Sequence, residues 1–201
     1  MAEISKIYTK ESFQEIIDFY FLYHHRISDY YSITKYFFNP ITEEEKELTR
    51  RDPFFYLTAN SSWALVILDL CKIFQESRNQ RYNLATIFKN IKTIPENKLI
   101  LDEIGETEMA NYILEIENLK PTIEKLKILR DKHYAHVDDI NLDLNTLENP
   151  SFADIEKALK VLENTVVKIA AKLFDADYMF ETDRVNAPSI INDVLKQRKL
   201  Y

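Results

Sequence analysis

The sequence predicts an all-α protein, an up-and-down bundle of about five to seven helices that forms a single domain over residues 1–201. Only one of the 201 residues is glycine, Gly105, whereas average usage would supply roughly 14 glycines. The chain contains no Asn-Gly or Asp-Gly pair, the strongest signal for a tight β-hairpin. Apolar residues instead recur at steps of three and four along most of the sequence, which is typical of helices.

The first helix is predicted over about residues 10–38. Its apolar seam alternates steps of three and four and consists of Phe13, Ile17, Tyr20, His24, Ile27 and Tyr31. Thr42 followed by Glu45 matches a capping box, which predicts a short acidic helix next. We interpret the acidic run at residues 43–47 as a solvated face of that helix.

Two further helices are predicted over about residues 55–76 and 81–92. Their apolar stripes are Trp63, Val66, Leu70 and Ile73 in the longer helix and Leu84, Ile87, Phe88 and Ile91 in the shorter one. Cys71 lies inside the apolar run of residues 65–71, which predicts a buried thiol and not a reactive one. As the only cysteine, it excludes an intrachain disulfide and a multi-cysteine zinc site.

A brief apolar turn after Pro95 is expected to end in a left-handed cap at Gly105. A long helix follows over residues 108–136, with a bend near Pro121. The last long helix opens at Ser151, which forms a capping box with Asp154. Its seam is Phe152, Ile155, Leu159, Leu162, Val166, Ile169 and Leu173, and a short helix over about residues 188–198 completes the bundle.

Composition excludes several classes of function. With one glycine the chain cannot build a P-loop or a dinucleotide-binding fingerprint, because both need several glycines where the backbone approaches phosphate. The net charge of -7 argues against wholesale binding to nucleic acid or to an anionic membrane. No uninterrupted apolar run approaches the roughly 18 residues of a membrane span, and the N-terminus is charged from its third residue. We therefore expect a cytoplasmic protein without a membrane partner.

Charge is nevertheless concentrated in one part of the sequence. Residues 120–136 contain five basic and two acidic side chains, whereas residues 137–156 contain six acidic side chains and no lysine or arginine. A basic helix end therefore adjoins an acidic segment. Two interpretations stay open, namely ordinary charge pairing on a solvated surface and a site for an anion.

Three side chains in this segment suggest how an anion would be bound. On a helix Arg130, His133 and His136 occupy one i, i+3, i+6 ridge. Arginine holds phosphate oxygens with two parallel hydrogen bonds, and histidine exchanges protons near neutral pH. A structural alternative is that the histidines cap the last carbonyls of the helix. A metal site with Asp138 and Asp139 is a further alternative, but the His-Glu-x-x-His arrangement is missing.

The segment at residues 129–138, Leu-Arg-Asp-Lys-His-Tyr-Ala-His-Val-Asp, resembles the signature helix of the HEPN superfamily (higher eukaryotes and prokaryotes nucleotide-binding), and within it the abortive-infection subgroup. Arg130, Asp131 and His136 carry the resemblance, with residues 125–129 leading in and the seam from Phe152 behind. It covers about residues 55–175, so the first helix and the tail after Asp177 are expected to lie outside the HEPN-like core.

The resemblance implies a bundle that forms a homodimer in which two Arg-polar-x4-His motifs face one cleft. Active members are metal-independent endoribonucleases without cofactors, often toxins of toxin-antitoxin or abortive-infection systems, so RNA, a second copy and an antitoxin protein are the implied partners. His136 would be the general base or acid for the RNA 2'-hydroxyl, Arg130 would stabilise the phosphorane, and Asp131 would orient the arginine or the partner motif. Lys127, Lys132 and His133 are the expected phosphate-binding residues.

One position departs from the family pattern. In a subgroup paired with nucleotidyltransferase antitoxins, a modified tyrosine follows the histidine by two residues, and this chain has Asp138 there. That argues against regulation by such modification. A catalytically inactive HEPN module that binds nucleic acid or nucleotide, and a helical scaffold that binds protein, stay open as alternatives. For His24 and His25, which stand among aromatic residues, the periodicity favours core or dimer packing over stacking on RNA bases.

Overall fold

The computed structural model describes residues 7–75, 81–131, 149–181 and 184–198. These residues form nine α-helices and no strand, so the predicted all-α class is confirmed. The bounds are α1 Lys10–Phe38, α2 Glu43–Arg51, α3 Pro53–Phe74, α4 Leu84–Thr93, α5 Lys98–Ile104, α6 Glu106–Glu117, α7 Lys120–Leu129, α8 Phe152–Phe174 and α9 Ala187–Arg198, with a 3-10 turn at Pro95–Asn97.

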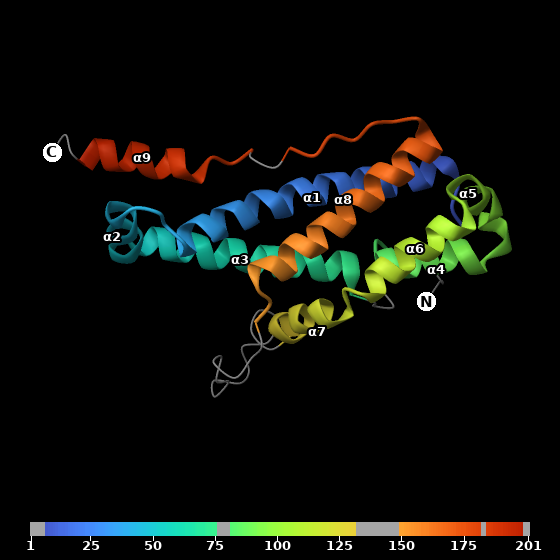
Figure 1. The fold of residues 1–201 in the computed structure, drawn as a ribbon, viewed down its shortest axis with the longest axis horizontal. Helices are drawn as coiled ribbons and strands as arrows, with labels where there is room; N and C mark the ends of the chain where they lie inside the picture. Colours follow the sequence, from blue (N-terminus) through green and yellow to red (C-terminus); the bar gives the residue numbers. More distant parts are fainter. Residues whose placement is uncertain (1–6, 76–80, 132–148, 182–183, 199–201) are drawn as a thin grey trace.

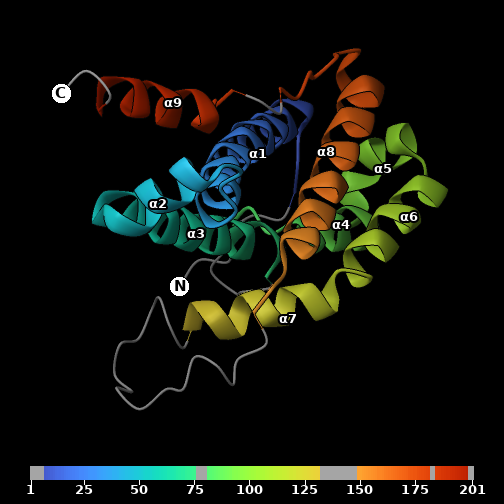
Figure 2. The same cartoon turned by 60° about the vertical axis from the view of Figure 1, so that its left-hand side comes forward.

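The helices pack in an antiparallel arrangement around α1 and α3. Figure 1 shows these two helices side by side and running in opposite directions, with α2 at the turn between them. Helix α8 crosses α1, helices α4 to α6 cover the far end, and α7 lies along the other side of α3 (Figure 2). The main core is drawn from α1 and from α3 to α8.

Two expected capping boxes are confirmed. The Thr42 side chain accepts a hydrogen bond from the Glu45 backbone N–H at the start of α2, and Ser151 caps α8 in the same way through Asp154. The acidic face of α2 is only partly solvated, however, because Glu45 is buried. Its carboxylate accepts hydrogen bonds from the Tyr36 hydroxyl at 2.6 Å and from the backbone N–H of Ile41 at 2.9 Å.

The described helices outnumber the five to seven that we expected, for two physical reasons. The single helix expected over residues 108–136 is interrupted at Asn118, so that α6 ends and α7 begins one turn later with Pro121 in its first turn. Proline lacks the backbone N–H that a continuous helix would need there, whereas the first turn leaves that N–H unused. In addition, the apolar turn after Pro95 is long enough to form α5.

Gly105 lies between α5 and α6, but it does not adopt the expected left-handed helical cap. Its φ of 95° and ψ of 135° lie outside the left-handed helical region. A left-handed cap is found instead at Asp175, which ends α8 with a φ of 49° and a ψ of 41°.

Helix α3 is long and apolar enough, by length and composition alone, to cross a membrane. The core helix of a soluble protein passes the same test, and here 44% of the apolar window is buried inside the protein. Asp69 in this helix is buried and paired with two basic side chains. The packing observed for α3 is therefore that of a central core helix.

Candidate functional site

Arg130 and Asp131 lie at the C-terminal end of α7. Buried Thr122, Leu126 and Leu129 fix the face that α7 turns toward the core. The backbone continues past Leu129 into a wider π-type turn at Arg130 and Asp131, a distortion that is frequent at functional sites. Both candidate side chains are therefore carried by a helix end that is anchored directly before them.

The Arg130 guanidinium is held by two side chains. Its Nε donates a hydrogen bond to Oδ1 of Asp131 at 2.7 Å, and Nη2 donates to the same oxygen. Nη1 donates to Oε1 of Gln75, at the C-terminal end of α3. A guanidinium has five N–H donors, so two N–H groups have no acceptor among the residues that the structure describes. The Arg130 side chain is 23% exposed.

Gln75 is the residue of this site that sequence reasoning missed. It caps α3, and its backbone N–H donates to the Cys71 carbonyl. Its side chain joins α3 to the motif helix across 55 positions of sequence, and no local spacing rule links residues that far apart. The only signal was its position as a polar residue directly after a long apolar run.

Cys71 lies close to Arg130 and is a buried thiol without the features of an activated nucleophile. The thiol is buried, and burial raises its pKa to about 12, against the smaller opposing effect of the Arg130 charge. The thiolate, which is the reactive form, is therefore negligible near neutral pH. This confirms the expected buried thiol.

The remaining motif residues are only partly covered by the structure. Lys127 lies in the last turn of α7, three positions before Arg130 on the same ridge, and is half-buried. Lys132, His133 and His136 lie outside the described residues, as do Asp138 and Asp139. The ridge joining Arg130 to His136 therefore stays a prediction. Within the described ranges no group of three or more His, Cys, Asp or Glu side chains is placed to hold a metal ion.

His24 and His25 are core residues. They are 2% and 6% exposed, and the Phe180 ring packs against both of them. Burial lowers the pKa of His24 to about 4, with a smaller contribution from His25. The sequence periodicity favoured packing of these two histidines over stacking on RNA bases, and their packing in the core is confirmed.

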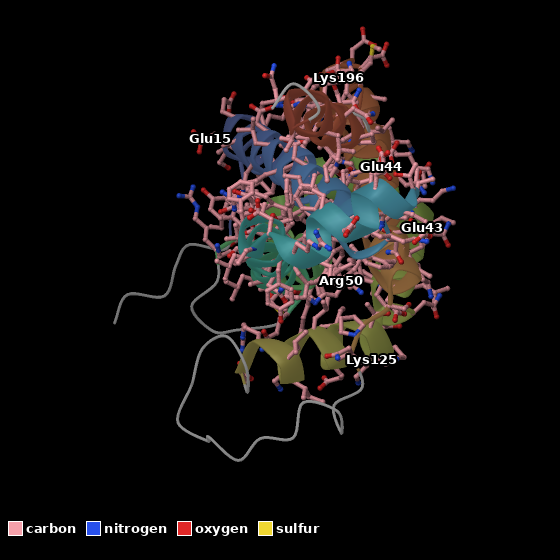
Figure 3. The ribbon with its side chains drawn as sticks, turned by 90° about the vertical axis from the view of Figure 1, so that its left-hand side faces the viewer. Glu15, Glu43, Glu44, Arg50, Lys125 and Lys196 are labelled. Atoms are coloured by element: carbon pink, nitrogen blue, oxygen red, sulfur yellow. The ribbon has the colours of Figure 1, made fainter. Side chains whose placement is uncertain are left out.

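A separate pocket of about 500 Å³ lies at the opposite end of α3. Its lining comes from the C-terminal end of α1, from α2 and from the first turns of α3: Phe37, Phe38, Asn39, Pro40, Lys46, Thr49, Arg50, Tyr56 and Ala59. Figure 3 faces this end of the molecule and labels Arg50, with Glu43 and Glu44 at the other end of α2. No residue of the Arg130 site lines the pocket, so the two features are distinct.

The family model described as HEPN_AbiU2 (AbiU2) matches residues 6–190. The match extends beyond the expected core of about residues 55–175 and includes all of α1. No curated protein and no solved structure matches the chain.

Proposed function

The chain belongs to the AbiU2 family of the HEPN superfamily, an abortive-infection family, and from this membership we propose that it is a metal-independent endoribonuclease. The match spans residues 6–190 and so includes the whole helical bundle as far as the start of α9. The proposed activity goes further than membership and depends on the chemistry of the Arg130 site.

The observation that carries the proposal is the way Arg130 is held. Asp131 and Gln75 fix its guanidinium from two sides and leave two N–H groups unused among the described residues. A fixed guanidinium binds two phosphate oxygens in parallel and stabilises the extra negative charge of a pentacoordinate transition state. Because the group is already oriented, little reorganisation is needed when that charge develops.

In the proposed reaction the RNA 2'-oxygen attacks the adjacent phosphorus while its proton passes to a base. A bond from phosphorus to the 2'-oxygen forms, the bond to the 5'-oxygen breaks, and the 5'-oxygen takes up a proton. The products are a 2',3'-cyclic phosphate and a free 5'-hydroxyl. We assign the proton transfers to His136 and the charge stabilisation to Arg130, with Asp131 as its positioning residue. Lys127, Lys132 and His133 would bind neighbouring phosphates.

We further propose that two copies of the chain form the site, with both motifs facing one cleft. A cleft of this kind would bring two arginines to one phosphate backbone. An antitoxin protein that covers the cleft would keep the activity latent in the cytoplasm. Size-exclusion chromatography with light scattering tests the dimer, and a monomer at micromolar concentration would contradict it.

The activity is tested with a labelled single-stranded RNA in the presence of EDTA. We expect cleavage by the wild type to survive EDTA and to leave 2',3'-cyclic phosphate ends. His136→Ala should lower the rate by about 10²- to 10⁴-fold, the usual contribution of acid–base catalysis. Lys168→Ala, at an exposed lysine of α8, is the matched control and should cleave normally. Equal cleavage by wild type and His136→Ala would remove the main support for the proposal.

A catalytically silent RNA-binding module is the second candidate, and one observation favours it. Three of the five N–H groups of Arg130 already donate to acceptors of its own chain, so most of its donors are engaged before any substrate binds. Such a module would bind RNA without turnover, and Arg130→Ala would weaken binding. The same RNA used for cleavage distinguishes the two candidates.

A further inference from the structure

A row of three polar residues on α3 joins the Arg130 site to the surface of α1. Asp69, Lys72 and Gln75 stand at i, i+3 and i+6 and therefore form one ridge of the helix. Asp69 binds Arg26 of α1, Lys72 is itself basic, and Gln75 binds Arg130. Adjacent positions on such a row are about 5–6 Å apart at Cβ, so the three cationic groups follow one another along the ridge.

The two cations at the α1 side share one buried carboxylate. Asp69 is 2% exposed and accepts hydrogen bonds from Arg26 Nε at 2.8 Å and from Lys72 Nζ at 2.9 Å. One cation would be enough to neutralise this carboxylate, so the second leaves the cluster with an excess positive charge. Arg26, Lys72 and Asp69 together therefore carry a net charge of +1.

Both cations are held in place and still face solvent. The Arg26 guanidinium lies 3.9 Å from the centroid of the Tyr23 ring, and the Lys72 ammonium lies 5.8 Å from the same centroid. Their side chains are nevertheless 41% and 51% exposed. Long basic side chains normally lose rotamer freedom when they bind a ligand, and groups that are already fixed lose less.

The cluster lies on the part of α3 between α1 and α7, where Lys72 is exposed among the described residues. Figures 1 and 2 both show α3 between these two helices. Leu65, Lys72 and Gln75 recur at i, i+7 and i+10, and they are exposed or half-buried. Along this strip Arg26 and Lys72 bind Asp69, and Gln75, one turn beyond Lys72, binds Arg130.

We propose that Arg26 and Lys72 form a phosphate-binding subsite for a single-stranded RNA whose reacting phosphate lies at Arg130. This proposal rests on the proposed function in one respect, namely that the reacting phosphate lies at Arg130. Phosphate contacts set the register of the strand without reading its sequence, so the subsite should bind RNAs of different sequence alike. An acidic protein segment is the competing occupant. If it were the true ligand, substitutions of Arg26 and Lys72 would leave the affinity for RNA unchanged.

The test measures RNA binding to His136→Ala protein as a function of salt concentration, with a fluorescent single-stranded oligoribonucleotide. Each phosphate contact on a single strand contributes about 0.7 to the slope of log affinity against log salt. Lys72→Gln should lower that slope by about 0.7 and weaken binding, while Arg26 keeps Asp69 paired. Lys72→Arg retains the charge and should restore the slope, which a purely structural role would not predict. Lys168→Gln, at an exposed lysine of α8, should leave the slope unchanged.

RNA binding and RNA cleavage, measured side by side, separate the subsite from the ribonuclease activity. RNA binding that depends on Lys72 in a protein that never cleaves RNA would support the subsite and contradict the enzyme. Cleavage by the wild type together with an unchanged slope in Lys72→Gln would support the enzyme and overturn the subsite. A His136→Ala protein that binds no RNA would overturn the subsite, and circular dichroism melting shows whether each variant is folded.

Discussion

His24 lies in the core without an acidic partner among the described residues that it contacts. Its ring packs against Phe180 with centroids 4.3 Å apart, and its Nδ1 is 3.5 Å from the Ser28 hydroxyl. Burial, together with the neighbouring His25, lowers its pKa from 6.5 to about 4. The folded protein therefore holds this imidazole neutral at pH values at which the unfolded chain would protonate it.

This difference predicts acid sensitivity between pH 7 and pH 5. The unfolded state binds the proton first as the pH falls through 6.5, so stability is present above that pH and is lost toward the folded pKa of about 4. The expected loss from pH 7 to pH 5 is about 2 kcal/mol in the free energy of urea unfolding. His24→Phe keeps a ring against Phe180 and should flatten this dependence. An identical loss in the variant would show that His24 is not responsible.

Acidic groups act in a different range of pH and do not obscure this test. Hydrogen bonding from Tyr36 lowers the pKa of Glu45 below 4.5, and a backbone hydrogen bond at Ser151 lowers the pKa of Asp154 below 3.8. The stability that these two carboxylates contribute is therefore lost at lower pH than the range from pH 7 to pH 5 in which His24 acts.

At the scale of single residues, the sequence predicted a side-chain contact only where both partners are close in sequence. Arg130 and Asp131 are adjacent, and their pairing was expected from the motif. Gln75 and Asp69 could not be predicted, because their partners lie on other helices and side-chain register between helices is not encoded in local spacing. Glu45 was assigned to solvent for the same reason, since the hydroxyl that buries it belongs to Tyr36 of α1.

At the scale of elements, helix starts were the best predicted feature. The capping boxes at Thr42 and Ser151 rest on residues three positions apart, and short-range chemistry of this kind is visible in sequence. The break between α6 and α7 was predicted only as a bend. Pro121 weakens a continuous helix here because it lacks a backbone N–H. Leu119 at the break is fully buried, and its packing stabilises the interrupted backbone.

The junction of α5 and α6 gives a prediction about Gly105. Its φ of 95° with a ψ of 135° is a conformation that side chains rarely adopt, and a Cβ would lie 3.1 Å from Oε2 of Glu108. We expect Gly105→Ala to lower the free energy of unfolding by about 1–3 kcal/mol. Asparagine is tolerated in the left-handed helical region, but the φ and ψ of Gly105 lie outside that region, so asparagine has no advantage over alanine here. Gly105→Asn should therefore destabilise as much as Gly105→Ala in thermal or urea unfolding.

The contact with Glu108 allows the two causes to be separated. Lys172 pairs with this carboxylate, but both side chains are partly exposed and can shift, so we expect the steric contact to add little to the backbone strain. In Gly105→Ala combined with Glu108→Ala the steric contact is removed and the backbone strain remains. A double variant as stable as Glu108→Ala alone would contradict the assignment to backbone conformation.

At the scale of the whole molecule, α1 belongs to the core and is not an appendage to it. Phe13, Ile17 and Tyr20 are each 1% exposed and pack in the main cluster. The apolar seam of this helix was visible in the sequence, but the resemblance to the family covered only about residues 55–175, so α1 was expected to lie outside the HEPN-like core. The family match over residues 6–190 agrees with the packing.

A second, smaller core cluster holds α9 against the end of the bundle. It consists of Phe37, Leu48, Phe55, Ala59, Ala187 and Ile191. Helix α9 packs against α1 and α2, and Figure 1 shows it at the end away from α4 to α6. Because few buried residues anchor this helix, its opening need not involve the main core.

Ile191→Ala tests whether α9 opens as a separate unit. Ile191 is fully buried, and removing its side chain from a core costs about 2–5 kcal/mol. We expect amide hydrogen exchange in α9 to accelerate by about 30-fold or more, since 1.4 kcal/mol corresponds to a tenfold change in the opening equilibrium. Amides of α8 should keep their protection. Ile190→Ala, at a neighbour that is 50% exposed, is the matched control and should leave both helices unchanged. Equal acceleration in α8 and α9 would instead mean that the two clusters unfold together and that α9 stabilises the entire bundle.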